Sequence, residues 1–225
     1  MGSFAVNFHI CSTDAETVKL WLVESQVQHA WMTGAESGWI SLVEEATSSQ
    51  NYRDITRFAE SLSDSVQSPV VAFLIHDSDF FRYWLYDNGN LIDWYISNPQ
   101  FLDEHECATE HNRRDHIDLL FDYCPAETSR SDLEAILNQP VPSSDLLDAG
   151  GTFLIADELL AMTGRCLGIV PGRCLSSFYN MRIPDSGADS PWQFVGVGPA
   201  ATPPVRLKVF EPDLSEAQKA FNQAL

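Results

Sequence analysis

The sequence predicts an α+β protein: a ferredoxin-like βαββαβ sheet, extended by a C-terminal β-hairpin and followed by a mostly helical second half. Three observations lead to this class. Patterns of strand and helix alternate over residues 4–76 in the order strand, helix, strand, strand, helix, strand, which is the split βαβ order. An Asn-Gly pair separates two aromatic runs over residues 80–97 and favours a hairpin turn. After residue 97, apolar residues recur mostly at helical spacing.

Six elements build the predicted core sheet. A short apolar run predicts a buried strand, and apolar residues at helical spacing predict a helix with one buried face. The strands are expected at residues 4–10, 27–33, 38–46 and 70–76, and the helices at residues 12–25 and 51–66. The first helix should begin with a capping box in which Thr13 bonds forward and Glu16 reaches back. Pro69 prevents the second helix from continuing into the next strand.

The hairpin strands are expected at residues 80–86 and 91–97, with Asn88-Gly89 as a two-residue loop. In that register Tyr86 faces Leu91, Trp84 faces Asp93 and Arg82 faces Tyr95. Because side chains alternate between the two faces of a strand, one face would be apolar and the other polar and aromatic. Trp, Tyr and Arg are the residue types that anchor interfaces, so this second face is the candidate binding surface. Its members are Arg82, Trp84, Tyr86, Asp93 and Tyr95. The alternative is that the second half of the chain packs on it.

Two units are expected along the chain. Residues 1–98 would form the ferredoxin-like α+β domain with its added hairpin, and residues 99–225 a mostly helical subdomain packed on or near the sheet. The helices of this second unit are expected at residues 114–124, 130–139, 153–164 and 214–225. One last short strand is expected after the Pro-rich stretch that ends near residue 204.

The charge restricts the class of partner. There are 13 Lys and Arg against 32 Asp and Glu, so the net charge is −19. Residues 1–75 carry 3 basic and 9 acidic side chains, residues 76–160 carry 4 and 18, and residues 161–225 carry 6 and 5, which gives −6, −14 and +1. This balance argues against nucleic acid or an anionic membrane surface and favours a basic protein or peptide.

The cysteines and the apolar runs indicate the compartment. Five cysteines are an odd number without the regular spacing of a disulfide framework, so reduced thiols are expected. Nowhere does the chain have the ~20 consecutive apolar residues that a membrane-spanning helix requires. A cytoplasmic location is therefore predicted.

One cluster directly follows the apolar strand at residues 70–76. His76, Asp77 and Asp79 offer one nitrogen and two carboxylates, which are ligands for a divalent cation. Asp77-Ser78-Asp79 also fits a turn, in which Asp side chains bond to nearby backbone N–H groups. Because aromatic strand residues resume at Phe80, the turn is the preferred interpretation.

A second group of possible ligands is His105, Cys107, His111 and His116, with Cys124 further along the chain. Zinc prefers such side chains, but their intervals are not those of the usual paired zinc motifs, and a solvated helix start is the preferred interpretation.

The sequence therefore predicts a cytoplasmic, non-catalytic binding protein with an acidic surface, of the inhibitor or immunity type. The alternative is a metal-dependent hydrolase that uses His76, Asp77 and Asp79. No nucleophile or dinucleotide motif is present, and no cofactor is expected. The sequence does not predict an oligomeric state.

Overall fold

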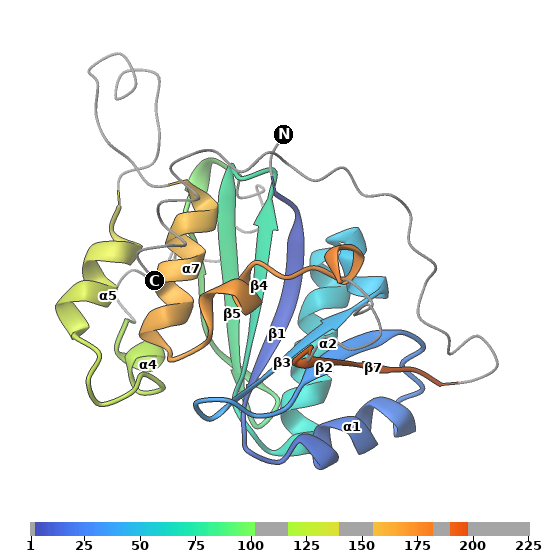
Figure 1. Ribbon diagram of the computed structural model, residues 1–225. Coiled ribbons are helices and arrows are strands. Elements are labelled where there is room, and N and C mark those ends of the chain that lie inside the picture. Colours follow the sequence, from blue (N-terminus) through green and yellow to red (C-terminus); the bar gives the residue numbers. More distant parts are fainter. Residues whose placement is uncertain (1–2, 102–116, 140–154, 182–189, 198–225) are drawn as a thin grey trace.

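The computed structural model describes residues 3–101, 117–139, 155–181 and 190–197. Seven strands form one antiparallel sheet in the order β6-β5-β4-β1-β3-β2-β7, and helices cover both of its faces (Figure 1). The strands are β1 (Ala5–Cys11), β2 (Ala30–Thr33), β3 (Trp39–Glu44), β4 (Val70–His76), β5 (Phe80–Asp87), β6 (Asn90–Ile96) and β7 (Trp192–Val195). The helices are α1 (Ala15–Glu24), α2 (Tyr52–Val66), α4 (Ile117–Phe121), α5 (Arg130–Leu137), α7 (Ala156–Cys166) and α8 (Pro171–Cys174), with 3-10 turns η1 (Ala46–Ser49), η2 (Pro99–Phe101) and η4 (Phe178–Asn180).

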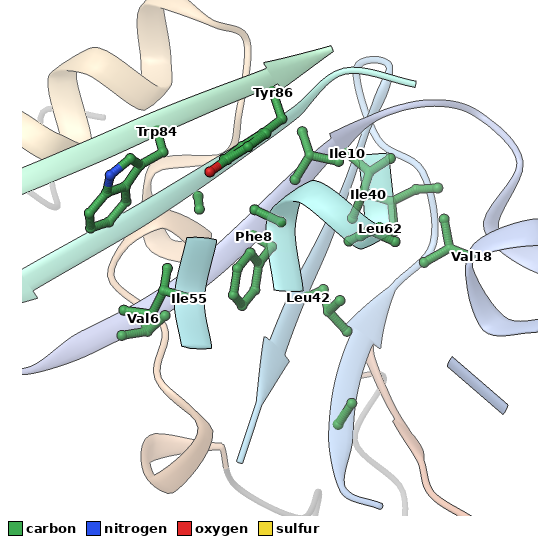
Figure 2. Packing of buried hydrophobic residues seen from close by; sticks show 14 of the residues in the cluster. Val6, Phe8, Ile10, Val18, Ile40, Leu42, Ile55, Leu62, Trp84 and Tyr86 are labelled. Carbon is green, nitrogen blue, oxygen red and sulfur yellow. The ribbon is translucent and has the colours of Figure 1, made fainter. Parts of the chain in front are cut away.

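The first face of the sheet packs against α1 and α2. Because side chains alternate along β1, Val6, Phe8 and Ile10 point to this face and join Leu22 of α1 and Leu62 of α2 in one buried cluster. Figure 2 shows this packing between the strands and α2. The burial of these side chains, rather than helix propensity, holds both helices on the sheet.

The ends of α1 and α2 follow ordinary capping rules. Asp14 caps α1, since its carboxylate accepts a hydrogen bond from the Thr17 backbone N–H at 3.0 Å. The predicted capping box of Thr13 and Glu16 is therefore wrong by one residue. At the C-terminus of α2, Gln67 adopts the left-handed conformation (φ 49°), as residues that end a helix commonly do.

The second face of the sheet packs against α4, α5, α7 and α8. Phe73 of β4 and Tyr83 of β5 point to this face and share a buried cluster with apolar side chains of the helices. Two hydrogen bonds tie the layers together: the Tyr95 hydroxyl donates to the Leu137 carbonyl at 2.8 Å, and Trp39 Nε1 donates to the Leu167 carbonyl at 2.7 Å. The helices of the second half thus complete the core of the sheet.

The strand β7 joins the sheet from the far end of the chain. Its residues pair with β2 over Ala30↔Val195 to Thr33↔Trp192, so a segment beyond residue 190 forms one edge of the sheet (Figure 1). The sequence analysis did not place a strand here, because four residues directly after Pro191 carry too short a pattern. The strand expected after residue 204 and the helix expected at residues 214–225 lie outside the described residues.

The predicted α+β class is confirmed. The sheet as a whole departs from a ferredoxin-like sheet with an added hairpin, because it has seven strands in the order given above and helices on both faces. The division into units at residues 1–98 and 99–225 stays a prediction. No helix in the described part of the chain is both long enough and apolar enough to cross a membrane.

Candidate functional site

The connection from β4 to β5 is the predicted turn. His76 pairs with Phe80 across it, and the Asp79 backbone N–H donates to the His76 carbonyl at 3.0 Å. Asp77 and Ser78 both have positive φ, 51° and 58°, as a type I′ turn requires. A left-handed conformation costs a non-glycine residue ~1 kcal/mol or more. Asp77 and Ser78 are therefore less favourable for the backbone of this turn than glycines would be.

Two contacts hold this turn in place. Ser78 is tied to the chain before β1, because its hydroxyl accepts from the Ser3 N–H at 2.8 Å and its own N–H donates to the Ser3 carbonyl at 3.3 Å. The Gln50 amide nitrogen donates to the Ile75 carbonyl at 2.7 Å, which turns its Oε1 toward His76 Nδ1, 2.7 Å away. Because an amide oxygen can only accept, His76 Nδ1 donates to Gln50 Oε1.

Four rings lie in a row across this end of the sheet. The Phe4 and His76 rings are 5.1 Å apart and edge to face, the His76 and Phe80 rings are 5.6 Å apart and stacked, and the Phe80 and Phe101 rings are 4.8 Å apart. Phe80 is buried in the core, whereas Phe4 is 49% exposed and Phe101 is 43% exposed. Asp77 and Asp79 are exposed on the turn between His76 and Phe80, the two inner rings of the row. We call these six residues the aromatic-acidic patch: Phe4, His76, Asp77, Asp79, Phe80 and Phe101.

The geometry of the turn does not favour a metal centre. Among the described residues, no three His, Cys, Asp or Glu side chains are grouped so that they could hold a metal ion. His76 and Asp77 lie at the exposed turn, and His76 bonds instead to Gln50. The possible zinc ligands at residues 105–116 lie outside the described residues, and only Cys124 of that group is placed; burial raises the pKa of its thiol to about 12.

The predicted binding face on the hairpin is divided between the two faces of the sheet. Asn88 and Gly89 form the expected turn, with φ of 47° and 75°, and Tyr86 faces Leu91 as expected. A β-bulge then adds Ile92 to β6, so that Trp84 faces Trp94, not Asp93, and Arg82 faces Ile96, not Tyr95. The expected register is wrong because one extra residue reverses the alternation of the whole strand.

The bulge separates the five candidate residues. Arg82, Trp84 and Tyr86 point to the face covered by α2, whereas Asp93 and Tyr95 point to the face covered by α4 and α5. All five are at most 5% exposed. The structure thus places them in the core and not on one open surface, and their role in binding stays a prediction.

Each half of this divided set has its own contacts. The Arg82 guanidinium lies 4.6 to 5.0 Å from the ring centroids of Tyr52, Trp84 and Trp94, which is cation–π distance. On the other face, the Tyr83 hydroxyl donates to Asp93 Oδ2 at 2.7 Å. Burial and this carboxylate raise the pKa of Tyr83 well above its usual range.

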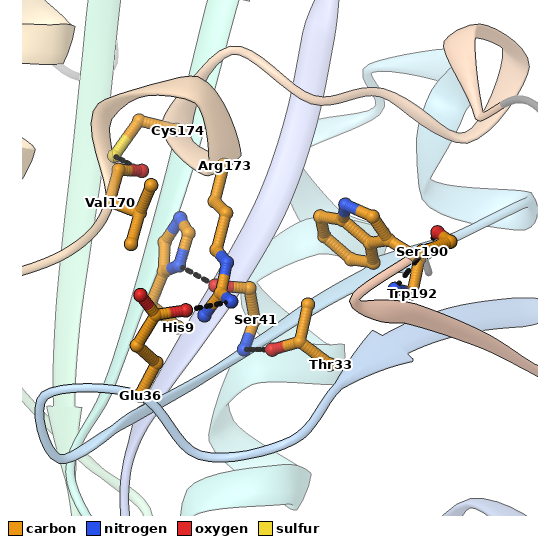
Figure 3. Close-up of polar contacts among 9 residues, drawn as sticks. All are labelled: His9, Thr33, Glu36, Ser41, Val170, Arg173, Cys174, Ser190 and Trp192. Atoms are coloured by element: carbon orange, nitrogen blue, oxygen red, sulfur yellow. Dashed lines mark hydrogen bonds and ion pairs between the residues drawn. The ribbon is translucent and has the colours of Figure 1, made fainter. Parts of the chain in front are cut away.

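Sequence analysis missed a buried polar relay on β1 and β3. Asn7 Nδ2 donates to the carbonyls of Cys174 and Ser176 at 2.6 and 2.9 Å, which leaves its Oδ1 to accept from His9 Nε2 at 2.8 Å. Nδ1 of a neutral His9 is then the acceptor for the Ser41 hydroxyl, 2.9 Å away (Figure 3). The alternation of Asn7 and His9 with apolar residues in AVNFHIC was the available signal.

The relay has the residue types of a nucleophile and its base, but its environment does not suit catalysis. Asn7, His9 and Ser41 are fully buried, and burial, with a smaller effect of the nearby Arg173 charge, lowers the pKa of His9 to about 3. A general base works best with a pKa near the working pH. Arg173 is in turn paired with Glu36 across the same region (Figure 3). The relay therefore fastens α8 to the sheet.

Comparisons with protein-family models, curated proteins and solved structures found no match to this chain.

Proposed function

We propose that this chain is a non-catalytic binding protein whose acidic surface meets a basic polypeptide, as an inhibitor or immunity-type protein would. The observation that carries the proposal is the net charge of −19 on a chain of 225 residues. Such a surplus creates a negative potential over the surface that attracts cationic partners and repels anionic ones.

The placement of the carboxylates supports this proposal. Residues 117–139 contain five acidic side chains and one basic one, Arg130, which pairs with Asp118 and Glu134. Asp122 and Asp132 are exposed in the same helical layer, and Asp77 and Asp79 are exposed at the turn. The described histidines are engaged in contacts within the fold, as His9 is in the relay and His76 is with Gln50. We propose a cytoplasmic location because the described cysteines, Cys11, Cys124, Cys166 and Cys174, are free thiols.

We also propose that β4-β1-β3-β2 with α1 and α2 is a ferredoxin-like core to which the other strands and helices are added. The order of these four strands and the antiparallel pairing of each neighbouring pair support this.

Binding of short cationic peptides tests the function. The dissociation constant of a fluorescent arginine-rich peptide would be measured by anisotropy at about 20 mM and about 500 mM salt, where the screening length falls severalfold. We expect binding at low salt that weakens by about tenfold or more at high salt, because the attraction is between charges at the surface. An oligoglutamate peptide of equal length is the control. Failure to bind the cationic peptide at low salt, or binding that salt does not change, would contradict the proposal.

Elemental analysis separates this function from the metal-dependent hydrolase. A stoichiometric metal in the purified chain, lost when Asp77→Ala and Asp79→Ala are combined, would favour the hydrolase.

A further inference from the structure

We propose that the partner docks on the aromatic-acidic patch and that this patch selects arginine side chains. This inference rests on the proposed function, because it names the surface and the side chain through which a basic polypeptide would be bound. Four observations carry it: the exposed rings, the adjacent carboxylates, the contacts that fix the turn, and the arginine already held among rings in the core.

The exposed rings are the first observation. Phe4 and Phe101 leave 49% and 43% of their surface in water at the two ends of a row whose inner members are His76 and Phe80. The row joins the residue before β1, the end of β4, the start of β5 and η2, so four segments of the chain bring an aromatic ring to one end of the sheet. Ring faces and edges of this kind are the anchoring surface of many protein interfaces.

The carboxylates decide the chemistry of the partner. Asp77 and Asp79 belong to the same turn as His76 and Phe80. A purely apolar partner would remove these carboxylates from water without giving them a counter-charge, which is unfavourable. A cationic side chain gives both a counter-charge to the carboxylates and a cation to the ring faces. The described residues offer no group of three metal ligands here, so we propose a cationic side chain as the occupant and not a metal ion.

Arginine meets these requirements better than lysine. The guanidinium is planar, stacks on aromatic faces and donates two parallel hydrogen bonds to one carboxylate, whereas the lysine ammonium is a compact and strongly hydrated point charge. The core of this chain contains the aromatic part of such a packing, since the Arg82 guanidinium lies within 5.0 Å of three ring centroids. The patch presents rings and carboxylates at the surface, where an arginine of another polypeptide can reach them.

The surface is also held ready for binding. Ser78 is fixed by its two hydrogen bonds with Ser3, and His76 by Gln50. A surface that is already ordered loses less conformational entropy on association. The positive φ of Asp77 and Ser78 forms the tight turn that carries Asp77 and Asp79 between His76 and Phe80.

The test compares two peptides and three variants of the full chain. The peptides have equal length and charge, one with arginines and one with lysines. The variants are Phe4→Ala with Phe101→Ala, which removes the exposed rings, Asp77→Asn with Asp79→Asn, which removes the charges, and Asp122→Asn with Asp132→Asn, which removes the same charge from exposed positions in the helical layer. Asn tolerates the left-handed conformation, so the turn is expected to fold in the second variant.

We expect the unaltered chain to bind the arginine peptide about threefold or more tightly than the lysine peptide. Each patch variant should weaken arginine-peptide binding by about tenfold, whereas the matched charge variant should weaken it by less than about twofold. Near-ultraviolet circular dichroism checks that each variant is folded.

Two results would overturn the inference, and they are distinguishable. Cationic binding that is weakened equally by the patch charge variant and the helical-layer charge variant would show that the patch is not the site, while the proposed function would stand. No cationic binding by the unaltered chain would contradict the proposed function itself. If the ring variant does not fold, the two charge variants alone decide between patch and helical layer.

Discussion

The buried histidine of β1 should make this fold sensitive to acid. His9 has both ring nitrogens engaged, by Asn7 and Ser41, and is fully buried beside Arg173. These surroundings lower its pKa from 6.5 to about 3. The neutral form is thus favoured in the folded state, while the unfolded chain takes up a proton below pH 6.5. The stability that depends on neutral His9 is fully present above pH 6.5 and is lost progressively as the pH falls from 6.5 toward 3.

The size of this effect follows from the shift. Between the two pKa values, each pH unit below 6.5 lowers the free energy of unfolding by ~1.4 kcal/mol, because only the unfolded chain binds the proton. At about two units below 6.5, the free energy of unfolding is therefore about 3 kcal/mol lower than at neutral pH. His9→Gln removes the titrating group, so its stability should change less over the same range. Glu44 opposes the trend in both proteins, because burial raises the pKa of its carboxyl and favours folding at lower pH.

Urea unfolding followed by tryptophan fluorescence measures this directly. Free energies of unfolding would be collected for the unaltered chain and for His9→Gln between pH 7.5 and about pH 4.5. The unaltered chain should lose about 3 kcal/mol more than the variant. Parallel curves for the two proteins would show that His9 is not held neutral in the fold, and the account of the relay would then be wrong.

Other substitutions test the packing and the turn. Gly164→Ala should destabilise the chain by about 1 to 3 kcal/mol in urea unfolding, because a Cβ there would lie 2.2 Å from Cys174 Sγ, whereas Gly172→Ala, with nothing within 4 Å, should be close to neutral. Leu62→Ala should lose about 2 to 5 kcal/mol in the same assay, since this side chain is fully buried between α2 and the sheet; a loss below 1 kcal/mol would contradict the packing described. Asp77→Gly should raise stability by about 1 kcal/mol by relieving a positive φ of 51° and should at the same time weaken binding of the arginine peptide; a variant that is less stable, or that binds as tightly, would contradict the role given to this turn.

Much of the fold could be predicted from local patterns. The order of the first six elements is as expected, and the Asn88-Gly89 turn is present, because apolar periodicity and turn chemistry act over a few residues. The helices at α4, α5 and α7 were also expected. Two features could not be predicted from local patterns. The pairing of β7 with β2 joins segments about 160 residues apart in the sequence. The bulge at Ile92 lacks a glycine, the residue that often marks a bulge in a sequence.

The candidate site was half visible in the sequence. HDSD after an apolar strand indicated either a turn or a metal site, and the turn is present. Phe4 and Phe101 gave no signal of their own, since Phe4 reads as one more apolar residue of the first strand and Phe101 lies in η2, five residues after β6. The neighbouring positions of β1 and β4 in a split βαβ order would have pointed to Phe4. The position of Phe101 beside Phe80 depends on the path of the chain after β6, which local sequence patterns do not indicate.

The most direct test of the central claim is to map where a cationic peptide binds. Backbone amide spectra of the isotopically labelled full chain would be recorded by nuclear magnetic resonance during titration with the arginine peptide. We expect the largest shifts at Phe4, at residues 76–80 and at Phe101, with small changes along α4 and α5. Shifts spread evenly over the exposed carboxylates, or confined to the helical layer, would contradict it.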